Sequence, residues 1–202
     1  MTSLPRIGKP AANALKNIGV TNLEQLTRVD KESLSRIHGI GPKAISTLEN
    51  ELEREDLAFR KHEPLPFTPG FIVFGSLDCN NAPKREIIRD FAISYVEGNK
   101  YGFVMTCDED MSLNILPDKE LQGMEEIHQH LLKKRHDIRM MDLKSIIIHG
   151  KEGAAYGSAV TIKGESIELA WFLEFNSHKK NALIQKVTFF EVRQQLNQSL
   201  HN

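Results

Sequence analysis

Two glycine-containing turns, 33 residues apart in the sequence, have the residue types of an anion-binding site. The phrase Ile7-Gly8-Lys9-Pro10-Ala11 returns as Ile40-Gly41-Pro42-Lys43-Ala44. Glycine permits a tight turn, and proline fits the first position of a helix, where no N–H bond is lost. The free backbone N–H groups at such a helix start can bind an anion, which in a protein is often a nucleic-acid phosphate.

The distribution of charge favours modest affinity for phosphate. The 202 residues carry a formal net charge of −1, so the chain as a whole is not an electrostatic binder of nucleic acid. Residues 1–48 contain seven basic and three acidic side chains, whereas residues 49–56 contain five acidic side chains and one arginine. A basic head whose last helix ends in acidic residues predicts modest rather than tight binding to a polyanion.

The second half of the chain contains scattered side chains that could line a ligand pocket. A proton-transfer enzyme needs an acid or a base held in an apolar pocket with a shifted pKa. The candidates for a ligand pocket are Asp110, His149, Tyr156, Trp171 and Glu174. None lies in a distinctive motif, because acids around Asp110 are typical of a solvated turn and aromatic residues around Trp171 are typical of a core or a dimer interface. We assign no catalytic residue.

The histidines and cysteines predict neither a metal site nor a disulfide. His128 and His130 are two residues apart, so they do not face each other on a helix, and His136 has no acidic partner in register. Cys79 and Cys107 lack metal-ligand spacing, and we expect both to be reduced. We expect no cofactor and no membrane span, and a cytoplasmic location, because no run is long and apolar enough to cross a bilayer and no signal pattern is present.

Apolar spacing and capping residues predict several short helices in residues 1–58. Thr21 with Glu24 is typical of a capping box, and Asp30 can cap a third helix. Pro42 then opens a longer helix after a glycine-containing turn. These elements must position the two repeated phrases.

Prolines interrupt the helical pattern in residues 59–81, which we predict to be a linker or arm. Pro64, Pro66 and Pro69 are typical of such a segment. The stretch from Phe71 to Phe74 is too apolar for a free linker, and we expect it to pack on a domain as a short strand or arm.

Residues 82–195 predict an α+β domain, followed by a tail at residues 196–202. The expected elements are a helix that ends at Gly98, a short helix around Tyr101, a strand from Met111 to Leu116, a helix over residues 119–135, and strands at about 141–149, 154–163, 166–176 and 183–193. Short links between the long strands imply an antiparallel, strongly curved sheet. The element order places the helices on one face of that sheet.

The second turn resembles the helix-hairpin-helix motif, in which an apolar-Gly-apolar-Gly hairpin joins two helices. Gly39, Ile40, Gly41 and Lys43 match the motif position by position. The resemblance implies that backbone N–H groups contact a phosphate, assisted by the basic residue, without reading bases. The alternative is a purely structural or protein-docking role, in which the glycines serve only the turn.

The first turn departs from that motif, because Arg6 stands where the first glycine should be. We expect this copy to complete the hydrophobic core of a doubled unit, although Gly8 and Lys9 could offer a second phosphate contact. Two joined hairpins over residues 3–57 resemble the tandem helix-hairpin-helix fold, which includes the C-terminal domain of the bacterial RNA polymerase α subunit and many small bacterial DNA-binding modules.

The C-terminal element order resembles the nuclear transport factor two-like family, also called SnoaL-like, with a cystatin-like α+β fold. The stretch from Leu121 to Ile127 resembles the opening of the family's third helix, where a glycine precedes a helix-forming run. The resemblance implies a cone with an internal pocket and frequent dimerisation through the sheet. Members include isomerases, cyclases and dehydratases as well as non-catalytic scaffolds.

Together these patterns predict a two-domain, bacterial-type protein that binds DNA backbone without sequence preference. Its C-terminal domain is expected to form a homodimer and to hold a small apolar ligand. A first alternative is an isomerase or hydratase acting on a small apolar substrate, with the hairpin unit as an accessory. A second alternative is a protein-interaction scaffold. Fold alone does not decide among them.

Overall fold

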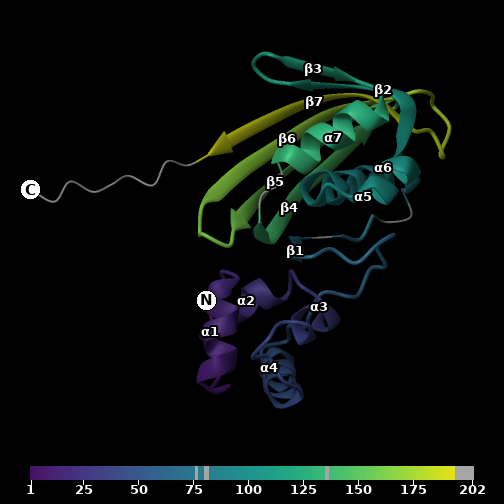
Figure 1. The fold of residues 1–202 in the computed structure, drawn as a ribbon. Coiled ribbons are helices and arrows are strands. Elements are labelled where there is room, and N and C mark those ends of the chain that lie inside the picture. The colour runs from purple at the N-terminus through teal and green to yellow at the C-terminus, as the bar shows by residue number, and fades with distance from the viewer. Residues whose placement is uncertain (76, 80–81, 135–136, 194–202) are drawn as a thin grey trace, which may run out of the picture. The chain divides into compact units, whose positions relative to one another are not determined.

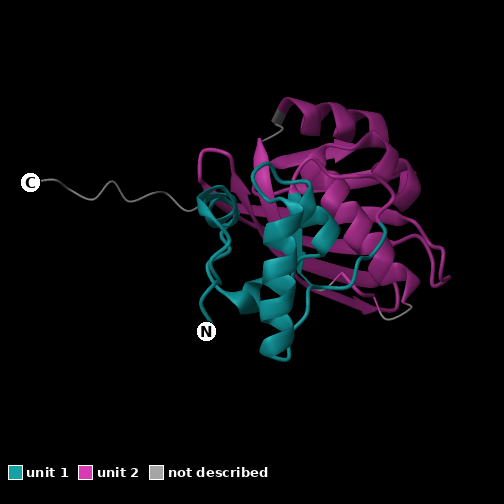
Figure 2. Ribbon diagram, turned by 90° about the horizontal axis from the view of Figure 1, so that it is seen from below, with its two compact units in different colours: residues 1–64, 72–76 teal, residues 65–71, 77–202 magenta. Residues whose placement is uncertain are grey.

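The chain forms two compact units in the computed structural model, which describes residues 1–75, 77–79, 82–134 and 137–193. Unit 1 comprises Met1–Pro64 and Ile72–Ser76, and unit 2 comprises Leu65–Phe71 and Leu77–Asn202 (Figure 2). The predicted tail at residues 196–202 lies outside the described residues.

Four helices form most of unit 1. They are α1 (Lys9–Asn17), α2 (Leu23–Leu26), α3 (Lys31–Ser35) and α4 (Pro42–Arg54). The short helices α2 and α3 are stable here because each packs fully buried leucines into one small core, among them Leu15, Leu23, Leu26, Leu34 and Leu48.

Capping residues set the starts of these helices. The side chain of Asp30 accepts a hydrogen bond of 2.8 Å from the Ser33 N–H, which confirms it as the N-cap of α3. The predicted capping box at Thr21 was wrong by one residue. Asn22 is the N-cap of α2 and exchanges hydrogen bonds with Gln25, because the chain enters the helix one position later than the Thr–Glu spacing indicated.

The buried side chain of Arg60 joins the two separated segments of unit 1. The Arg60 guanidinium lies 2.6 Å from the Asp30 carboxylate, and the two side chains are only 9% and 5% exposed. The same guanidinium donates to the carbonyl oxygens of Arg28, Val73 and Gly75. Arg60 therefore connects the cap of α3 to the strand β1 (Ile72–Gly75), whose four residues are all buried.

We expected the apolar stretch from Phe71 to Phe74 to pack on a domain as a short strand or arm, and the structure contains the strand β1 there. The Gly75 N–H donates to the Arg28 carbonyl, and β1 packs against α3 within unit 1. A four-residue strand rich in apolar side chains is stable when it is covered, and it would be an aggregation hazard if it were exposed.

Hydrogen bonding dominates the electrostatics of Asp30. Burial alone would raise the pKa of this carboxyl above its ordinary value of 3.8, but the bonds from the Ser33 N–H, the Ser33 hydroxyl and Arg60 lower it to about 2. The carboxylate is thus charged at neutral pH, and its charge is compensated by Arg60.

Unit 2 is a curved sheet with helices on one face (Figure 1). Its helices are α5 (Pro83–Glu97), α6 (Lys100–Thr106) and α7 (Met124–Lys134). Its strands are β2 (Cys107–Ile115), β3 (Lys119–Gln122), β4 (Ile138–His149), β5 (Glu152–Thr161), β6 (Ser166–Phe175) and β7 (Ile184–Arg193). The predicted α+β architecture is confirmed.

The strands of unit 2 lie in the order β4-β5-β6-β7-β2-β3. The predicted antiparallel pairing holds for the four long C-terminal strands, but β2 pairs in parallel with β7, so the sheet is mixed. Short links enforce antiparallel pairing only between consecutive strands, and β2 and β7 are far apart in the sequence. The helix expected from residue 119 begins at Met124, because Lys119–Gln122 pairs with β2 and Gly123, with φ +82°, ends that strand.

An aromatic cluster forms the core of unit 2. Trp171 and Phe103 are fully buried, and the Tyr95 ring lies 5.8 Å and 6.5 Å from them between ring centroids. The ring of Phe189 lies 4.6 Å from that of Tyr95. These contacts fasten α5 and α6 to the sheet face that bears Trp171, so the opposite face of the sheet points away from the helices.

We expect Arg60→Met to lower the free energy of unfolding of unit 1 by about 3–5 kcal/mol, because it leaves the buried Asp30 carboxylate without its cation. Arg54→Met is the matched control, since Arg54 forms an exposed ion pair with Glu51 and should cost less than about 1 kcal/mol. Urea unfolding of the full chain measures both values. Equal losses for the two variants would contradict the assignment of Arg60 as the link between α3 and β1.

Candidate functional site

The second hairpin places its glycines in different backbone conformations. Gly39 has φ +95°, which favours glycine, and a Cβ atom added there would lie 3.2 Å from the carbonyl oxygen of Pro10. Ile40 is buried, whereas Gly39, Gly41 and Lys43 are exposed. Gly39 is therefore required by the turn itself.

Gly41 needs another explanation, because its conformation does not require glycine. It has φ −90° and ψ 171°, an extended conformation open to any residue, and a Cβ atom added there would have no neighbour within 4 Å. Glycine is also used where a backbone must approach a ligand closely. The bare backbone at Gly41 leaves room for such an approach.

The start of α4 has the composition of an anion site. Gly41 is the N-cap and supplies no side-chain hydrogen bond, and Pro42 occupies the first turn. The first N–H groups of a helix have no intrahelical partner and carry the positive end of the helix dipole. Lys43 is exposed in this first turn, so a cationic side chain and backbone donors occupy the same helix start.

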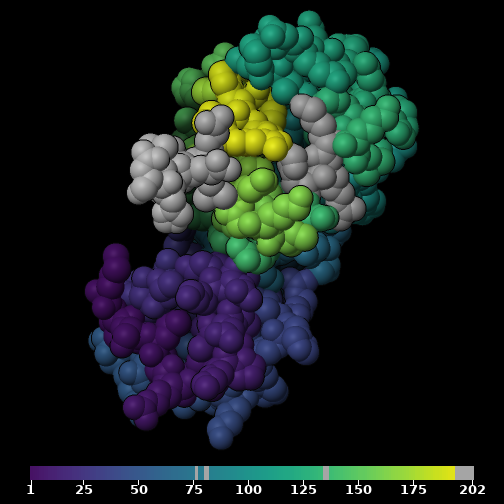
Figure 3. Space-filling view, turned by 60° about the vertical axis from the view of Figure 1, so that its left-hand side comes forward, coloured from purple at the N-terminus to yellow at the C-terminus, as the bar shows by residue number. Residues whose placement is uncertain are grey.

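The first hairpin leads into the start of α1, which lies next to the second hairpin. Gly8 is the N-cap of α1 with φ +83° and no side-chain cap, and Lys9 is exposed. The contact of Gly39 with Pro10 shows that the two hairpins adjoin at the beginning of α1. The start of the chain (dark purple) lies at the surface of unit 1 in Figure 3. The glycine of this copy serves the turn, unlike Gly41.

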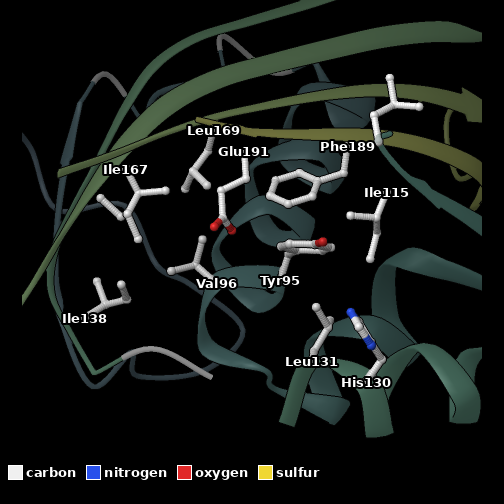
Figure 4. A pocket seen from close by; sticks show the side chains of 12 residues that line it. Tyr95, Val96, Ile115, His130, Leu131, Ile138, Ile167, Leu169, Phe189 and Glu191 are labelled. Carbon is white, nitrogen blue, oxygen red and sulfur yellow. The ribbon is translucent and has the colours of Figure 1, made fainter. Parts of the chain in front are cut away.

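Unit 2 contains a cavity between its helices and the inner face of its sheet (Figure 4). Its volume is about 210 Å³. The lining residues are Tyr95, Val96, Ile115, Leu116, His130, Leu131, Ile138, Ala159, Ile167, Leu169, Phe189 and Glu191. Nine of these residues are apolar, and the other three, Tyr95, His130 and Glu191, carry groups that can form polar interactions with a ligand.

The polar groups of the cavity differ in their surroundings. Burial, and to a smaller degree the charge of Glu191, raises the pKa of Tyr95 well above its ordinary value of 10. The Glu191 carboxylate accepts a hydrogen bond of 2.7 Å from Arg193, which lies on the same side of β7. The Lys119 ammonium lies 2.7 Å from Nδ1 of His130 and can only donate, so Nδ1 is the acceptor.

The structure places the five predicted pocket residues outside this cavity lining. Asp110 is exposed on β2, and His149 is exposed at the end of β4. Tyr156 and Glu174 point outward from β5 and β6, where Tyr156 bonds to Glu168 and Glu174 pairs with Lys151. Trp171 is completely buried in the aromatic cluster.

Strand parity explains why the lining residues were missed. The alternation of side chains along a strand places Glu174 and Trp171 on opposite faces of the sheet, but it does not show which face the helices cover. Glu191 has the same parity as the buried Val187 and Phe189, and this was the available signal that it faces inward. Tyr95 lies on the buried stripe of α5, which is typical of a core residue, and it also lines the cavity.

The part of the chain that the structure describes contains no cluster of three or more His, Cys, Asp or Glu side chains able to hold a metal ion. Within the same described ranges, no helix has the length and apolarity needed to cross a membrane.

Residues 1–54 match the family model described as a SAM-like helix-hairpin-helix tandem. The predicted tandem helix-hairpin-helix unit is thereby confirmed. Within this stretch, glycine turns precede α1 and α4, and only the second turn follows another helix, α3. Comparison of the chain with curated proteins finds no match.

Several solved structures of low sequence identity are similar to part of this chain. An NTF-2 like protein of unknown function from Burkholderia xenovorans is 11% identical with a TM-score of 0.48, covering 58% of this chain and 88% of its own. A protein of unknown function with a cystatin-like fold from Methylobium petroleophilum is 13% identical with a TM-score of 0.47, covering 60% and 82%. A protein with a ketosteroid isomerase-like fold from Catenulispora acidiphila, in complex with trimethylamine, is 13% identical with a TM-score of 0.43, covering 52% and 83%. Proteins that share a fold at such identities can differ in function.

We expect the two glycines of the second hairpin to respond differently to alanine. Gly39→Ala should destabilise unit 1 by about 1–2 kcal/mol, because alanine is strained at a positive φ and its Cβ meets Pro10. Gly41→Ala should change the free energy of unfolding by less than about 0.5 kcal/mol, because its surroundings are open. Urea unfolding of both variants measures the difference, and an equal cost at both positions would contradict the conformational assignment.

Proposed function

We propose that unit 1 binds the sugar–phosphate backbone of nucleic acid, with DNA as the first expectation, through the second hairpin. The observation that carries this proposal is Gly41, an exposed, uncapped glycine whose backbone conformation does not need glycine. Lys43 adds a cation at the same helix start. The match of residues 1–54 to the helix-hairpin-helix tandem family supports the proposal.

Backbone donors select phosphate and not base sequence, so the proposed binding is non-specific. Residues 1–48 have four more basic than acidic side chains, which favours a modest affinity that falls as salt rises. Gly8 and Lys9 are proposed as a second phosphate contact, because the two hairpins adjoin.

We further propose that the chain forms a homodimer through the outer face of its sheet, defined by Ile147, Tyr156, Phe172, Phe190 and Val192. These side chains are between 38% and 65% exposed. The rings of Phe172 and Phe190 contact each other at 5.7 Å between centroids, across neighbouring strands β6 and β7. An exposed apolar patch of this kind is typical of a protein interface.

Lys144 and Glu168 on the outer face compensate each other. Lys144 lies 3.0 Å from the Glu168 carboxylate, and the Tyr156 hydroxyl donates to the same carboxylate at 2.6 Å. The hydrogen bond from Tyr156, with a smaller one from Lys144, lowers the pKa of Glu168. Because this pair is already formed within one chain, a second copy can cover it without leaving either charge unpaired.

Dimerisation and weak nucleic-acid binding support each other physically. Two copies of unit 1 on one dimer make the second binding event intramolecular, which raises avidity without any new contact. The cavity of unit 2 is the proposed site of a small apolar ligand, and the nine apolar residues in its lining support this proposal. The free and buried Cys79 and Cys107 fit the reducing cytoplasm that we propose as the location.

We expect Lys43→Glu to weaken binding to a short DNA duplex by about tenfold or more at low salt, since hydrogen bonds to charged groups contribute about 1.5–3 kcal/mol. Gly41→Ala should also weaken binding, because its methyl group occupies the approach to the backbone. Fluorescence anisotropy with the full chain measures both, using duplex and single-stranded DNA.

Lys16→Glu is the matched control for this binding experiment. It changes the net charge equally but lies in the last turn of α1, about 10 Å along the helix from Lys9. Its affinity should stay within about twofold of the wild type. Absence of binding at low salt, or equal losses for Lys16→Glu and Lys43→Glu, would contradict the proposed hairpin contact.

We expect Phe172→Glu to convert the dimer to a monomer, because it places a charge in the centre of the outer face. Val104→Glu introduces the same charge at a 52% exposed apolar position on α6 and should leave the dimer intact. Light scattering after size-exclusion chromatography measures the molar mass. A monomeric wild type, or dissociation by Val104→Glu alone, would refute the proposed interface.

A further inference from the structure

The ammonium group of Lys84 is buried in unit 2 without a carboxylate to neutralise its charge. Lys84 is only 9% exposed. Its Nζ donates to the carbonyl oxygens of Gly150 at 2.7 Å and Ser177 at 2.9 Å, and it lies 4.8 Å from the centre of the Phe175 ring. These groups are neutral, and no carboxylate among the described residues forms an ion pair with Lys84. Buried charges in native proteins are generally paired, so this one calls for an explanation.

The position of Lys84 in α5 is also unfavourable for a cation. Lys84 lies in the first turn of the helix, at the positive end of the helix dipole. Glu86 is the acidic residue of that turn, but it is exposed to solvent. Burial, and to a smaller degree the charge of Lys151, lowers the pKa of Lys84 below its ordinary value of 10.5. An anion near Lys84 would offset these costs.

Lys84 holds two loops together at one end of the sheet. Gly150 lies in the turn between β4 and β5, and Ser177 lies in the loop between β6 and β7. The ring of His178 lies against the first of these loops, since a Cβ atom added at Gly150 would lie 3.6 Å from its Cε1 atom. The bonds from Lys84 therefore fix the two loops side by side, together with the charged side chains that they carry.

Lysines gather on these two loops. Lys151 lies in the first loop, and Lys179 and Lys180 lie in the second. Lys179 and Lys180 are exposed, and within the described part of the chain neither side chain forms an ion pair. Residues 175–190 contain three lysines and no acidic residue, although the whole chain has a net charge of −1. A local excess of cations raises the concentration of anions at this surface.

The carboxylates beside the loops interact with other groups. Glu174 lies 3.7 Å from the Lys151 ammonium. Asp108 accepts a hydrogen bond of 2.9 Å from the side chain of Asn176. Glu152 is exposed on β5, where solvent and salt screen its charge. The two exposed lysines of the second loop therefore remain available to a ligand.

We infer that Lys84 and these two loops form a binding site for a phosphate group. Lys179 and Lys180 contact the phosphate oxygens, and Lys84 attracts the anion from a buried position where its charge is weakly screened. A phosphate monoester carries a charge of about −1.5 to −2 at neutral pH and three acceptor oxygens, which suits several ammonium groups. This site goes beyond the proposed hairpin contact, since it lies in unit 2 and does not depend on nucleic-acid binding by unit 1.

The first test is an NMR titration of the ¹⁵N-labelled full chain with inorganic phosphate at neutral pH, compared with chloride at equal ionic strength. Phosphate should shift the amide signals of Lys151, Lys179 and Lys180 to saturation, and chloride should not. Lys180→Glu should weaken phosphate binding at the loops by about tenfold or more, because hydrogen bonds to charged groups contribute about 1.4 kcal/mol or more.

Lys163→Glu is the matched control. Lys163 is exposed in the turn between β5 and β6, at the opposite end of these strands and roughly 30 Å away along ten residues of β5. This variant makes the same change of net charge and should alter phosphate affinity by less than about twofold. Equal phosphate affinities in the wild type and Lys180→Glu, or the same shifts with chloride, would overturn the inference.

Lys84→Met tests the contribution of the buried charge. It should also weaken phosphate binding at the loops by about tenfold or more. Because it removes the bonds to both loops, its thermal unfolding is measured as well, and Lys180→Glu alone decides the inference if Lys84→Met does not fold. A folded Lys84→Met variant that binds phosphate as tightly as the wild type would contradict the role given to Lys84.

The same variants with a short DNA duplex identify the source of the phosphate. If Lys180→Glu also weakens DNA binding, the site contacts the nucleic-acid backbone; unchanged DNA affinity assigns the site to a small phosphorylated molecule. Lys43→Glu should leave the phosphate shifts of the loops unchanged. Failure of the hairpin proposal and failure of this inference are therefore distinguishable.

Discussion

The buried pair of Arg60 and Asp30 is the interaction on which the geometry of unit 1 depends. Asp30 caps α3 and accepts a hydrogen bond from the Ser33 hydroxyl. The same hydroxyl accepts a hydrogen bond from Arg36, which precedes the second hairpin in the sequence. Arg60 extends this network to β1 through three carbonyl oxygens. A buried ion pair contributes little net stability compared with well-packed apolar residues, but breaking it leaves an uncompensated charge. It therefore specifies one arrangement of α3 and β1.

The two glycines of the second hairpin have different reasons to be glycine. Gly39 satisfies a positive φ and a close contact with Pro10, so any chain with this turn needs glycine there. Gly41 meets neither requirement, and its exposure next to Lys43 is what favours a phosphate contact over a purely structural turn. In the first copy, Arg6 takes the place of a glycine. Gly8 has a positive φ that favours glycine, and no side chain caps the start of α1.

Much of the fold could be predicted from the sequence, because local signals determine it. Pro42, Asp30 and the glycine turns predicted the helices of unit 1, and strand alternation predicted the long C-terminal strands. Pairing between distant segments could not be predicted from local patterns. β3 forms at Lys119–Gln122 because it pairs with β2. β2 lies parallel to β7, although nothing in the sequence of either strand indicates the partner. The cavity residues could not be predicted for the same reason. Strand alternation places Glu191 on the same face as Phe189, but it does not show which face of the sheet the helices cover.

We propose separate roles for the two units: the backbone donors and the cation of unit 1 contact phosphate, and the sheet of unit 2 forms the dimer while its cavity holds a small ligand. The most direct test of the central claim is a ¹⁵N-labelled NMR titration of the full chain with a short DNA duplex at low salt. The account predicts the largest amide shift changes at Gly39, Ile40, Gly41 and Lys43, with smaller changes at Gly8 and Lys9, and the same pattern for a duplex of unrelated sequence. Shift changes confined to other parts of the chain, or none on saturation with DNA, would contradict it.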